Sequence, residues 1–200
     1  MGFEIKRVGV IGAGQMGNGI AHVCAIAGYD VSLNDLSTER IQLGLATING
    51  NMTRQVNKGL VAEDVKNAAL SRIRAAENLD ALADCDLVIE AATEQEQVKR
   101  KIFQQLCPVL KPEALLATNT SSISITRLAA ATDRPERFVG VHFMNPVPVM
   151  QLVELVRGIA TDDVTFDLCK GFVARLGKIP TVAEDFPAFI VNRILLPMIN

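Results

Sequence analysis

The stretch RVGVIGAGQMG, residues 7–17, decides the fold of this chain. Its first part, RVGVIG (7–12), is a short apolar run that ends in glycine and is typical of a buried β-strand. Residues 15–27 then carry helix-forming side chains and stop at Gly28, a residue that often ends a helix. The stretch therefore predicts a strand, a tight glycine-rich turn and a helix.

The glycines of this turn have the spacing G-x-G-x-x-G, and the next strand, predicted over residues 29–35, ends in the acidic residue Asp35. A strand, this glycine pattern, a helix and a later acidic residue together indicate a dinucleotide site. In such a site Gly12 permits the tight turn, Gly14 lets the backbone approach a pyrophosphate, and Gly17 allows close packing of helix and strand.

Asp35 also indicates which dinucleotide is bound. A carboxylate at this position accepts hydrogen bonds from ribose hydroxyls and repels a 2′-phosphate. No arginine follows it directly, since Arg40 comes five residues later. We therefore expect NAD rather than NADP.

The rest of the chain alternates between helical and strand patterns. The expected elements are helices from about 38 and near 62–71, a strand at 86–92, a helix at 95–110, a strand at 114–119, a helix at 124–131, strands at 137–143 and 152–158, a helix at 163–176 and a strand at 179–185. This alternation predicts an α/β fold, a Rossmann-type doubly wound and mostly parallel sheet with helices on both faces. No helix separates the strands at 137–143 and 152–158, so we expect a hairpin-like excursion there.

Residues 186–200, FPAFIVNRILLPMIN, place apolar side chains around most of a helix, a pattern that requires cover on several sides. We therefore expect an NAD-binding Rossmann domain over residues 1–185. Residues 186–200 are expected to be the first helix of a C-terminal helical domain that is otherwise missing from the chain.

Composition excludes several function classes. The chain is 49% hydrophobic and 21% charged with a net charge of -2, which gives no reason to expect a nucleic-acid partner. No uninterrupted apolar run is long enough to span a membrane. The four cysteines are far apart in sequence and form no CxxC pair, so neither a metal site nor a redox pair is predicted, and reduced thiols in a cytoplasmic protein are expected.

Two residues suggest acid–base chemistry. His142 ends a predicted strand, where ligands gather in open α/β sheets, and a histidine is suited to removing the hydroxyl proton of an alcohol. Glu154 lies in the otherwise apolar run LVELV, and a buried carboxylate is costly unless it is paired. Pairing with His142 would fix the ring tautomer, although a solvated sheet edge is an alternative for Glu154. The second histidine, His22, lies among apolar residues of the first helix and is interpreted as structural.

Taken in order, GAGQMGNGIA, Asp35, EAATEQEQVKRKIF, NTSSISI, HFMNPVPVMQLVELV and FIVNRIL resemble the L-3-hydroxyacyl-CoA dehydrogenase family. The bacterial 3-hydroxybutyryl-CoA dehydrogenases are the members that the chain resembles most. The glycine motif is common to many families, whereas NTSS, the histidine-containing segment and FIVNR together are highly specific to this one.

The resemblance implies roles for individual residues. The catalytic residues would be His142, Glu154, Ser121 and Asn192. The cofactor-binding residues would be Gly12, Gly14, Gln15, Met16, Gly17, Asp35, Glu94, Lys99 and Asn119. The substrate-binding residues would be Ser121, Asn192, Lys58, Arg54 and Asn51, the last standing where the family usually has a serine.

The resemblance also implies an activity, the reversible NAD-dependent oxidation of a short (S)-3-hydroxyacyl-CoA such as 3-hydroxybutyryl-CoA to the 3-ketoacyl-CoA. Family members usually carry an all-helical C-terminal domain that closes the cleft and forms a dimer, so a homodimer is expected of the full-length protein. Two alternatives stay open. One is a non-catalytic NAD-binding module, and the other is a related oxidoreductase of the gulonate dehydrogenase type.

Overall fold

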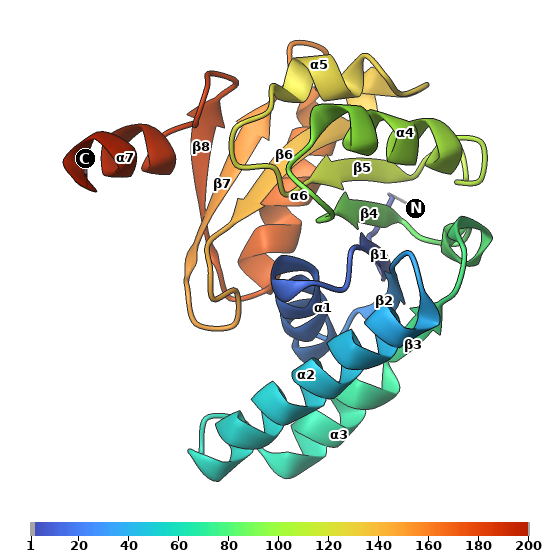
Figure 1. The fold of residues 1–200 in the computed structure, drawn as a ribbon, viewed down its shortest axis with the longest axis vertical. Helices are drawn as coiled ribbons and strands as arrows, with labels where there is room; N and C mark the ends of the chain where they lie inside the picture. The colour runs from blue at the N-terminus through green and yellow to red at the C-terminus, as the bar shows by residue number, and fades with distance from the viewer. Residues whose placement is uncertain (1–2, 200) are drawn as a thin grey trace.

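The computed structural model describes residues 3–199, apart from the side chain of Leu196, and within this part of the chain one eight-stranded sheet forms the centre (Figure 1). The outermost residues of the two expected domains, 1–2 and 200, lie outside this range. The strands are β1 (Arg7–Ile11), β2 (Asp30–Asn34), β3 (Ile73–Ala76), β4 (Leu87–Glu90), β5 (Leu115–Thr118), β6 (Phe138–Phe143), β7 (Leu152–Arg157) and β8 (Ile179–Glu184).

The strand order is β3-β2-β1-β4-β5-β6-β7-β8. All neighbouring strands run parallel except β6 and β7, which pair antiparallel. The order of the first six is that of a Rossmann sheet, whose topological switch point lies between β1 and β4. The predicted doubly wound α/β fold and the hairpin-like excursion between β6 and β7 are both confirmed.

Helices cover both faces of the sheet. The helices of the described residues are α1 (Gln15–Ile26), α2 (Thr38–Asn57), α3 (Glu63–Ser71), α4 (Glu96–Leu106), α5 (Ile125–Ala129), α6 (Asp163–Arg175) and α7 (Val191–Ile199), with short 3-10 turns at Leu79–Leu82 and Pro135–Arg137. One apolar core lies between the sheet and α1 and α6, and a second lies between the sheet and α4 and α5. Along β4, Leu87 and Ile89 enter the first core and Val88 the second, as the two-residue period of a strand requires.

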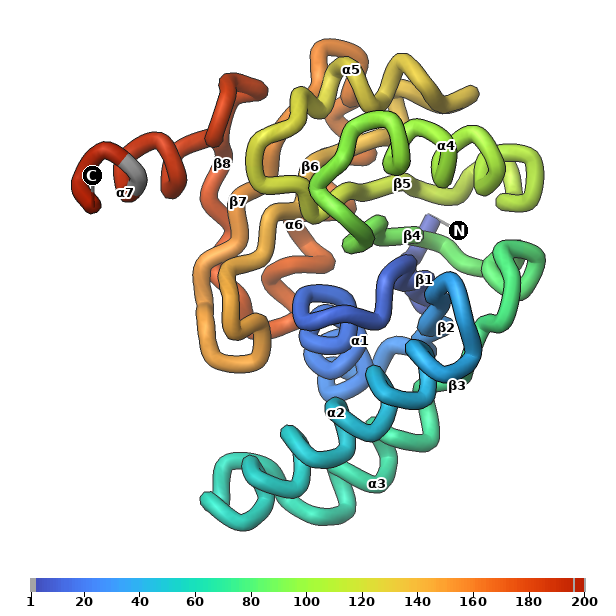
Figure 2. The backbone as a smooth tube through the Cα atoms, in the orientation of Figure 1, coloured from blue at the N-terminus to red at the C-terminus, as the bar shows by residue number. Residues whose placement is uncertain are grey.

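Helices α2 and α3 form an arm that extends away from the sheet, visible in cyan in both views (Figures 1 and 2). The 20 residues of α2 make it about 30 Å long. One face of α2, with the buried residues Ile41, Gly44, Ile48 and Met52, packs against the rest of the domain, and the end of the helix carries the residues expected to meet coenzyme A.

Strand β3 is not among the elements predicted from the sequence. Its four residues, IRAA, show no alternation of apolar and polar side chains, and three of them are at least partly exposed. β3 pairs only with β2 at the edge of the sheet, where burial imposes little pattern on the sequence. The last helix is also shorter than expected, since α7 begins at Val191 after an irregular segment.

The connection between β6 and β7, residues 144–151, is held against α1 and α6 in several ways. Lys178 Nζ donates hydrogen bonds to the carbonyl oxygens of Val147 (2.6 Å) and Met150 (2.7 Å). Gly19 of α1 leaves room for Val147, because a Cβ at position 19 would lie 2.8 Å from Val147 Cβ. The Asn145–Pro146 peptide bond in this connection is cis. These contacts determine where the chain leaves the strand that carries His142.

Candidate active site

The turn between β1 and α1 has the geometry that a pyrophosphate needs. Gly12 has φ +99°, and a Cβ at Gly17 would lie 1.6 Å from the carbonyl oxygen of Gly12. A Cβ at Gly14 would meet nothing within 4 Å, so this side of the turn is open. Gly14 is the N-cap of α1 and provides no side-chain cap, which leaves backbone N–H groups of the first turn free for phosphate oxygens. Gln15 is exposed at this helix start and Met16 half-buried.

Asp35 lies beside this turn, at the carboxyl end of β2. Its Oδ2 accepts a hydrogen bond from Ala13 N at 2.7 Å, and its Oδ1 accepts one from Leu36 N at 2.7 Å. Arg40 Nη1 lies 3.7 Å from Asp35 Oδ1, so the arginine does reach this carboxylate from five positions further along the chain. The turn and the carboxylate together fit the phosphates and the adenosine ribose of NAD.

A cavity of about 390 Å³ lies at the carboxyl ends of β4, β5 and β6. It is lined by Met16, Ala91, Ala92, Glu94, Lys99, Asn119, Ser121, His142, Phe143, Met144, Asn145 and Asn192. In a Rossmann fold the dinucleotide crosses the switch point, so with the adenosine half at β2 the nicotinamide half belongs on the β4 side. The cavity thus brings together seven of the predicted site residues, namely Met16, Glu94, Lys99, Asn119, Ser121, His142 and Asn192. Glu154 and the predicted cofactor residues of the glycine turn other than Met16 do not line it, nor does Asp35.

His142 and Glu154 are directly opposed in the antiparallel register of β6 and β7. His142 Nδ1 lies 2.7 Å from Glu154 Oε2, and both side chains are buried, Glu154 completely. An ionised carboxylate only accepts hydrogen bonds, so the ring proton resides on Nδ1. The ring lines the cavity, to which Nε2 can offer a lone pair.

The second oxygen of Glu154 holds the start of α7. Glu154 Oε1 accepts hydrogen bonds from Ile190 N (2.9 Å) and Val191 N (2.8 Å). The preceding residue, Phe189, is buried with its ring centroid 5.8 Å from that of His142. Glu154 therefore links His142 to the helix that carries Asn192. Phe189 was not predicted from the sequence as part of this site.

Asn192 and Ser121 meet across the cavity. Asn192 Nδ2 donates to the carbonyl oxygen of Ser121 at 3.4 Å. The Ser121 hydroxyl donates to Glu94 Oε1 at 3.1 Å, and its backbone N–H donates to the same oxygen at 2.8 Å. The serine hydroxyl thus has lone pairs available to a bound ligand while its proton is directed at Glu94.

Glu94 organises the polar turn that follows β5. Burial opposes its ionisation, but hydrogen bonds, first among them those from Thr120 and Ser121, outweigh burial and hold the pKa of this carboxyl below its usual value. Thr120 Oγ1 donates to Glu94 Oε1 at 2.6 Å. Asn119, at the start of the same turn, accepts a hydrogen bond from Phe143 N at 2.9 Å through its Oδ1, which ties the turn to the end of β6.

Glu90 is a polar residue that the sequence analysis missed. It ends β4, is completely buried and accepts hydrogen bonds from Lys99 Nζ with both carboxylate oxygens at 2.8 Å. The signal was present in the sequence: a carboxylate in the apolar run DLVIEAA needs a partner for the same reason as Glu154 in LVELV.

The residues expected to meet coenzyme A lie apart from the cavity. Asn51 and Arg54 occupy the last turns of α2, where the Arg54 guanidinium donates to Asn51 Oδ1, and Lys58 caps the helix. Arg54 and Lys58 are exposed and Asn51 is half-buried. They form a basic tip on the α2–α3 arm.

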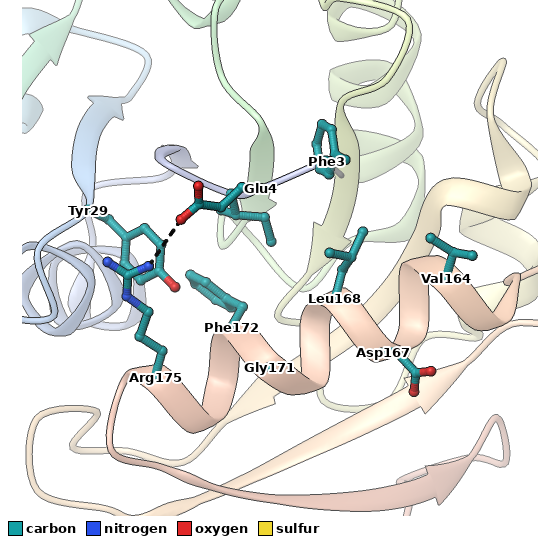
Figure 3. Close-up of a pocket in the computed structure, with 10 residues that line it drawn as sticks. Phe3, Glu4, Tyr29, Val164, Asp167, Leu168, Gly171, Phe172 and Arg175 are labelled. Carbon is teal, nitrogen blue, oxygen red and sulfur yellow. Dashed lines mark ion pairs between the residues drawn. The ribbon is translucent and has the colours of Figure 1, made fainter. Parts of the chain in front are cut away.

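A larger cavity, of about 530 Å³, lies elsewhere, between α6 and the segment that precedes β1 (Figure 3). There Arg175 reaches from α6 to Glu4 at 3.8 Å and lies over the ring of Tyr29, with Phe172 beside it. Its lining contains neither histidine nor any residue of the predicted site. We therefore take the smaller cavity, which His142 lines, as the candidate active site.

Within the described part of the chain, no group of three or more His, Cys, Asp or Glu side chains is arranged to hold a metal ion. Across the same residues, none of the helices combines the length and apolar character needed to cross a membrane.

Comparison with known proteins agrees with this geometry. Residues 7–186 match the family model for the 3-hydroxyacyl-CoA dehydrogenase NAD-binding domain. The whole chain is 73% identical to a 3-hydroxybutyryl-CoA dehydrogenase of Bradyrhizobium diazoefficiens and covers 68% of that protein. A probable 3-hydroxybutyryl-CoA dehydrogenase of Deinococcus radiodurans is 48% identical over 97% of this chain and 69% of its own length.

Among solved structures, that of (S)-3-hydroxybutyryl-CoA dehydrogenase from Ralstonia eutropha superimposes with a TM-score of 0.96 at 47% identity, over 98% of this chain and 70% of the other. The predicted family and NAD as the cofactor are thereby confirmed. The chain belongs to the 3-hydroxyacyl-CoA dehydrogenase family and contains its NAD-binding domain.

Proposed function

We propose that this chain catalyses the reversible oxidation of a short (S)-3-hydroxyacyl-CoA, with (S)-3-hydroxybutyryl-CoA as the expected substrate, to the 3-ketoacyl-CoA. The observation that carries the proposal is the buried His142–Glu154 pair, 2.7 Å apart beside the cavity. The substrate class is supported by the relatives named as 3-hydroxybutyryl-CoA dehydrogenases.

His142 acts as the base. Glu154 holds the ring proton on Nδ1, so Nε2 removes the proton of the substrate 3-hydroxyl group while the C3–H bond breaks and the C3–O double bond forms. NAD, when bound, supplies the acceptor for the hydride that leaves C3. Glu154 stabilises the imidazolium that results. In the reverse direction the imidazolium returns its proton to the ketone oxygen.

Ser121 and Asn192 orient the substrate oxygen. Both line the cavity with His142, and the hydrogen bond from Asn192 Nδ2 to Ser121 O keeps the two side chains together. Small errors in this orientation cost large factors in rate. Lys58 and Arg54 at the tip of the arm carry charge suited to coenzyme A phosphates, with Asn51 held beside Arg54.

Steady-state turnover of acetoacetyl-CoA with NADH tests the assignment. The variant His142→Gln should lower kcat by at least about 10³-fold, as loss of a catalytic base does, with little change in the Kd of NADH. His22→Gln is the matched control, because His22 lies on α1 and bonds Gln55 outside the cavity. Undiminished turnover by the His142 variant would refute the assignment. NADH binding by the unmodified chain without any turnover would instead favour a non-catalytic NAD-binding module.

We further propose a division at residue 185, with residues 1–185 as the NAD-binding domain and residues 186–200 as part of a helical domain. The full-length protein is proposed to be a cytoplasmic homodimer. Support for the compartment comes from the cysteines, all four of which are free and buried. Support for association comes from the apolar side chains that β8 and α7 expose, among them Val182, Ile194 and Met198. Sedimentation equilibrium of the full-length protein would measure the association.

A further inference from the structure

Glu90 is buried beside the candidate active-site cavity and forms a cluster of charged side chains with Lys99 and Glu94, which line it. Lys99 Nζ donates to both oxygens of Glu90 at 2.8 Å and also lies 3.5 Å from Glu94 Oε2. Lys99 and Glu94 line the cavity, whereas Glu90 is completely buried behind them. One ammonium group is thus bracketed by two carboxylates, and the formal charge of this Glu90–Lys99–Glu94 cluster is -1.

Further contacts of Glu90 keep this arrangement rigid. Thr118 Oγ1 donates to Glu90 Oε2 at 2.7 Å, and Ala92 N donates to Glu90 Oε1 at 2.8 Å. Together with Lys99, these donors occupy both oxygens of the carboxylate. A charge held this firmly in a buried site acts more strongly than one in water, because little solvent is present to screen it.

The charge of the cluster acts differently on the two forms of the cofactor. The nicotinamide ring is positively charged when oxidised and neutral when reduced. A net negative charge at the wall of the cavity attracts the oxidised ring and has little effect on the reduced ring.

We propose that Glu90 is a positioning residue that holds Lys99 and keeps the cluster at a net charge of -1, and that this charge favours binding of NAD+ over NADH. The inference rests on the proposed location of the nicotinamide half in this cavity. Glu90 is completely buried and does not line the cavity. It acts on the cofactor through the charge of the cluster and through the position of Lys99.

Three variants separate the effect of charge from that of structure. Glu90→Gln and Glu94→Gln each raise the cluster charge from -1 to 0. The double variant Glu90→Gln with Lys99→Met removes one carboxylate and the ammonium together and returns the charge to -1. In the double variant the amide introduced at position 90 can still accept from Ala92 N and donate to Thr118 Oγ1, so the buried site keeps its hydrogen bonds.

The measured quantity is the ratio of the dissociation constants of NADH and NAD+, from isothermal titration of each cofactor without substrate. The ratio should fall about 10- to 30-fold in Glu90→Gln and in Glu94→Gln, the effect expected between two unit charges roughly 8 Å apart at an effective dielectric constant of about 20–30. It should return to within about twofold of the original value in the double variant.

Asp84→Asn is the control for a change of one unit of charge. Asp84 is exposed, pairs with Arg7 and lies in the turn before β4, whereas Glu90 is at the opposite end of that strand. The ratio should not change there, because solvent and salt screen an exposed charge that lies away from the cavity.

Equal weakening of NAD+ and NADH in Glu90→Gln would mean that Glu90 is only structural and would overturn the proposal. If Glu90→Gln does not fold, Glu94→Gln and the double variant still test the proposal. A changed ratio of dissociation constants in the double variant, or an unchanged ratio in Glu94→Gln, would contradict it. Failure of the proposed catalysis is distinguishable, because it appears in the turnover of His142→Gln and leaves these binding constants unchanged.

Discussion

Replacing Glu154 by glutamine is the sharpest test of the proposed acid–base pair, because both oxygens of this side chain accept hydrogen bonds and a glutamine has only one oxygen. Oε2 accepts from His142 Nδ1 at 2.7 Å, and Oε1 accepts from Ile190 N and Val191 N at 2.9 and 2.8 Å. A glutamine offers one acceptor oxygen and one NH2 donor group. It can therefore satisfy the backbone pair or the present histidine tautomer, but not both.

The backbone pair should determine the orientation of the glutamine. Backbone N–H groups can only donate, and leaving these two part-buried groups without an acceptor costs up to about 1–3 kcal/mol each. The imidazole Nδ1 can accept as well as donate. We expect the amide oxygen of Glu154→Gln to face residues 190 and 191 and its NH2 group to donate to Nδ1, which moves the ring proton of His142 to Nε2.

A histidine protonated at Nε2 cannot remove the substrate proton. The loss in kcat should be about 10³- to 10⁴-fold, the effect of a wrong tautomer in other catalytic pairs, equivalent to about 4–5.5 kcal/mol in the activation barrier. The midpoint of thermal unfolding should change little, because the backbone hydrogen bonds are kept.

Nitrogen-15 NMR of the histidine ring reports the tautomer directly, and turnover of acetoacetyl-CoA with NADH reports the rate. Glu184→Gln on the neighbouring strand β8 is the control, since Glu184 is exposed and lies opposite Arg157 in the register. An unprotonated Nε2 together with undiminished turnover in Glu154→Gln would refute the reasoning. So would a large fall in thermal stability with the tautomer unchanged.

Three further outcomes follow from the structure. Gly17→Ala should weaken NADH binding at least about 100-fold, because the new Cβ would lie 1.6 Å from a carbonyl oxygen of the glycine turn. The control Gly171→Ala adds a Cβ at a helical position with nothing within 4 Å and should leave the Kd of NADH unchanged. Asp35→Ser should strengthen NADPH binding relative to NADH about tenfold or more, as titration of both cofactors would measure. The change removes the repulsion of a 2′-phosphate and frees Arg40, whose Nη1 lies 3.7 Å from the Asp35 carboxylate, to bind that phosphate. Burial, the largest influence on His22, lowers its pKa below the usual value of 6.5, so the unfolded chain binds the proton more tightly than the folded chain. The free energy of unfolding should therefore fall as the pH drops from 6.5 toward the folded pKa. Urea unfolding at about pH 7.5 and about pH 5.5 measures this fall, which should be smaller in His22→Gln.

Much of the fold could be predicted because its signals are local. The glycine turn, the helix stop at Gly28 and the acidic end of β2 lie within about thirty residues, and each follows from a backbone or packing requirement at its own position. Strand β3 was missed for the opposite reason. At the edge of the sheet its half-exposed residues are under little pressure to alternate, so their sequence carries no pattern.

The candidate site was predictable to the extent that buried charge demands a partner. Glu154 in LVELV predicted a pair with the histidine twelve residues earlier, and the structure brings the two side chains together. The same demand applied to Glu90, whose partner Lys99 lies on the following helix rather than on a paired strand. Spacing along the chain could not identify that partner, because a long lysine side chain can reach many places from a helix.

By itself, the sequence determined the Rossmann unit and NAD as its cofactor and pointed to His142 and Glu154 as the proposed acid–base pair, since each rests on a short motif or on the high cost of an unpaired buried group. Only the tertiary structure decided that Glu154 serves two partners, His142 and the start of α7, and that Lys99 is shared by Glu90 and Glu94. These contacts join elements far apart in the chain. Their energies depend on separations of a few ångströms, and strand register and helix packing set such separations.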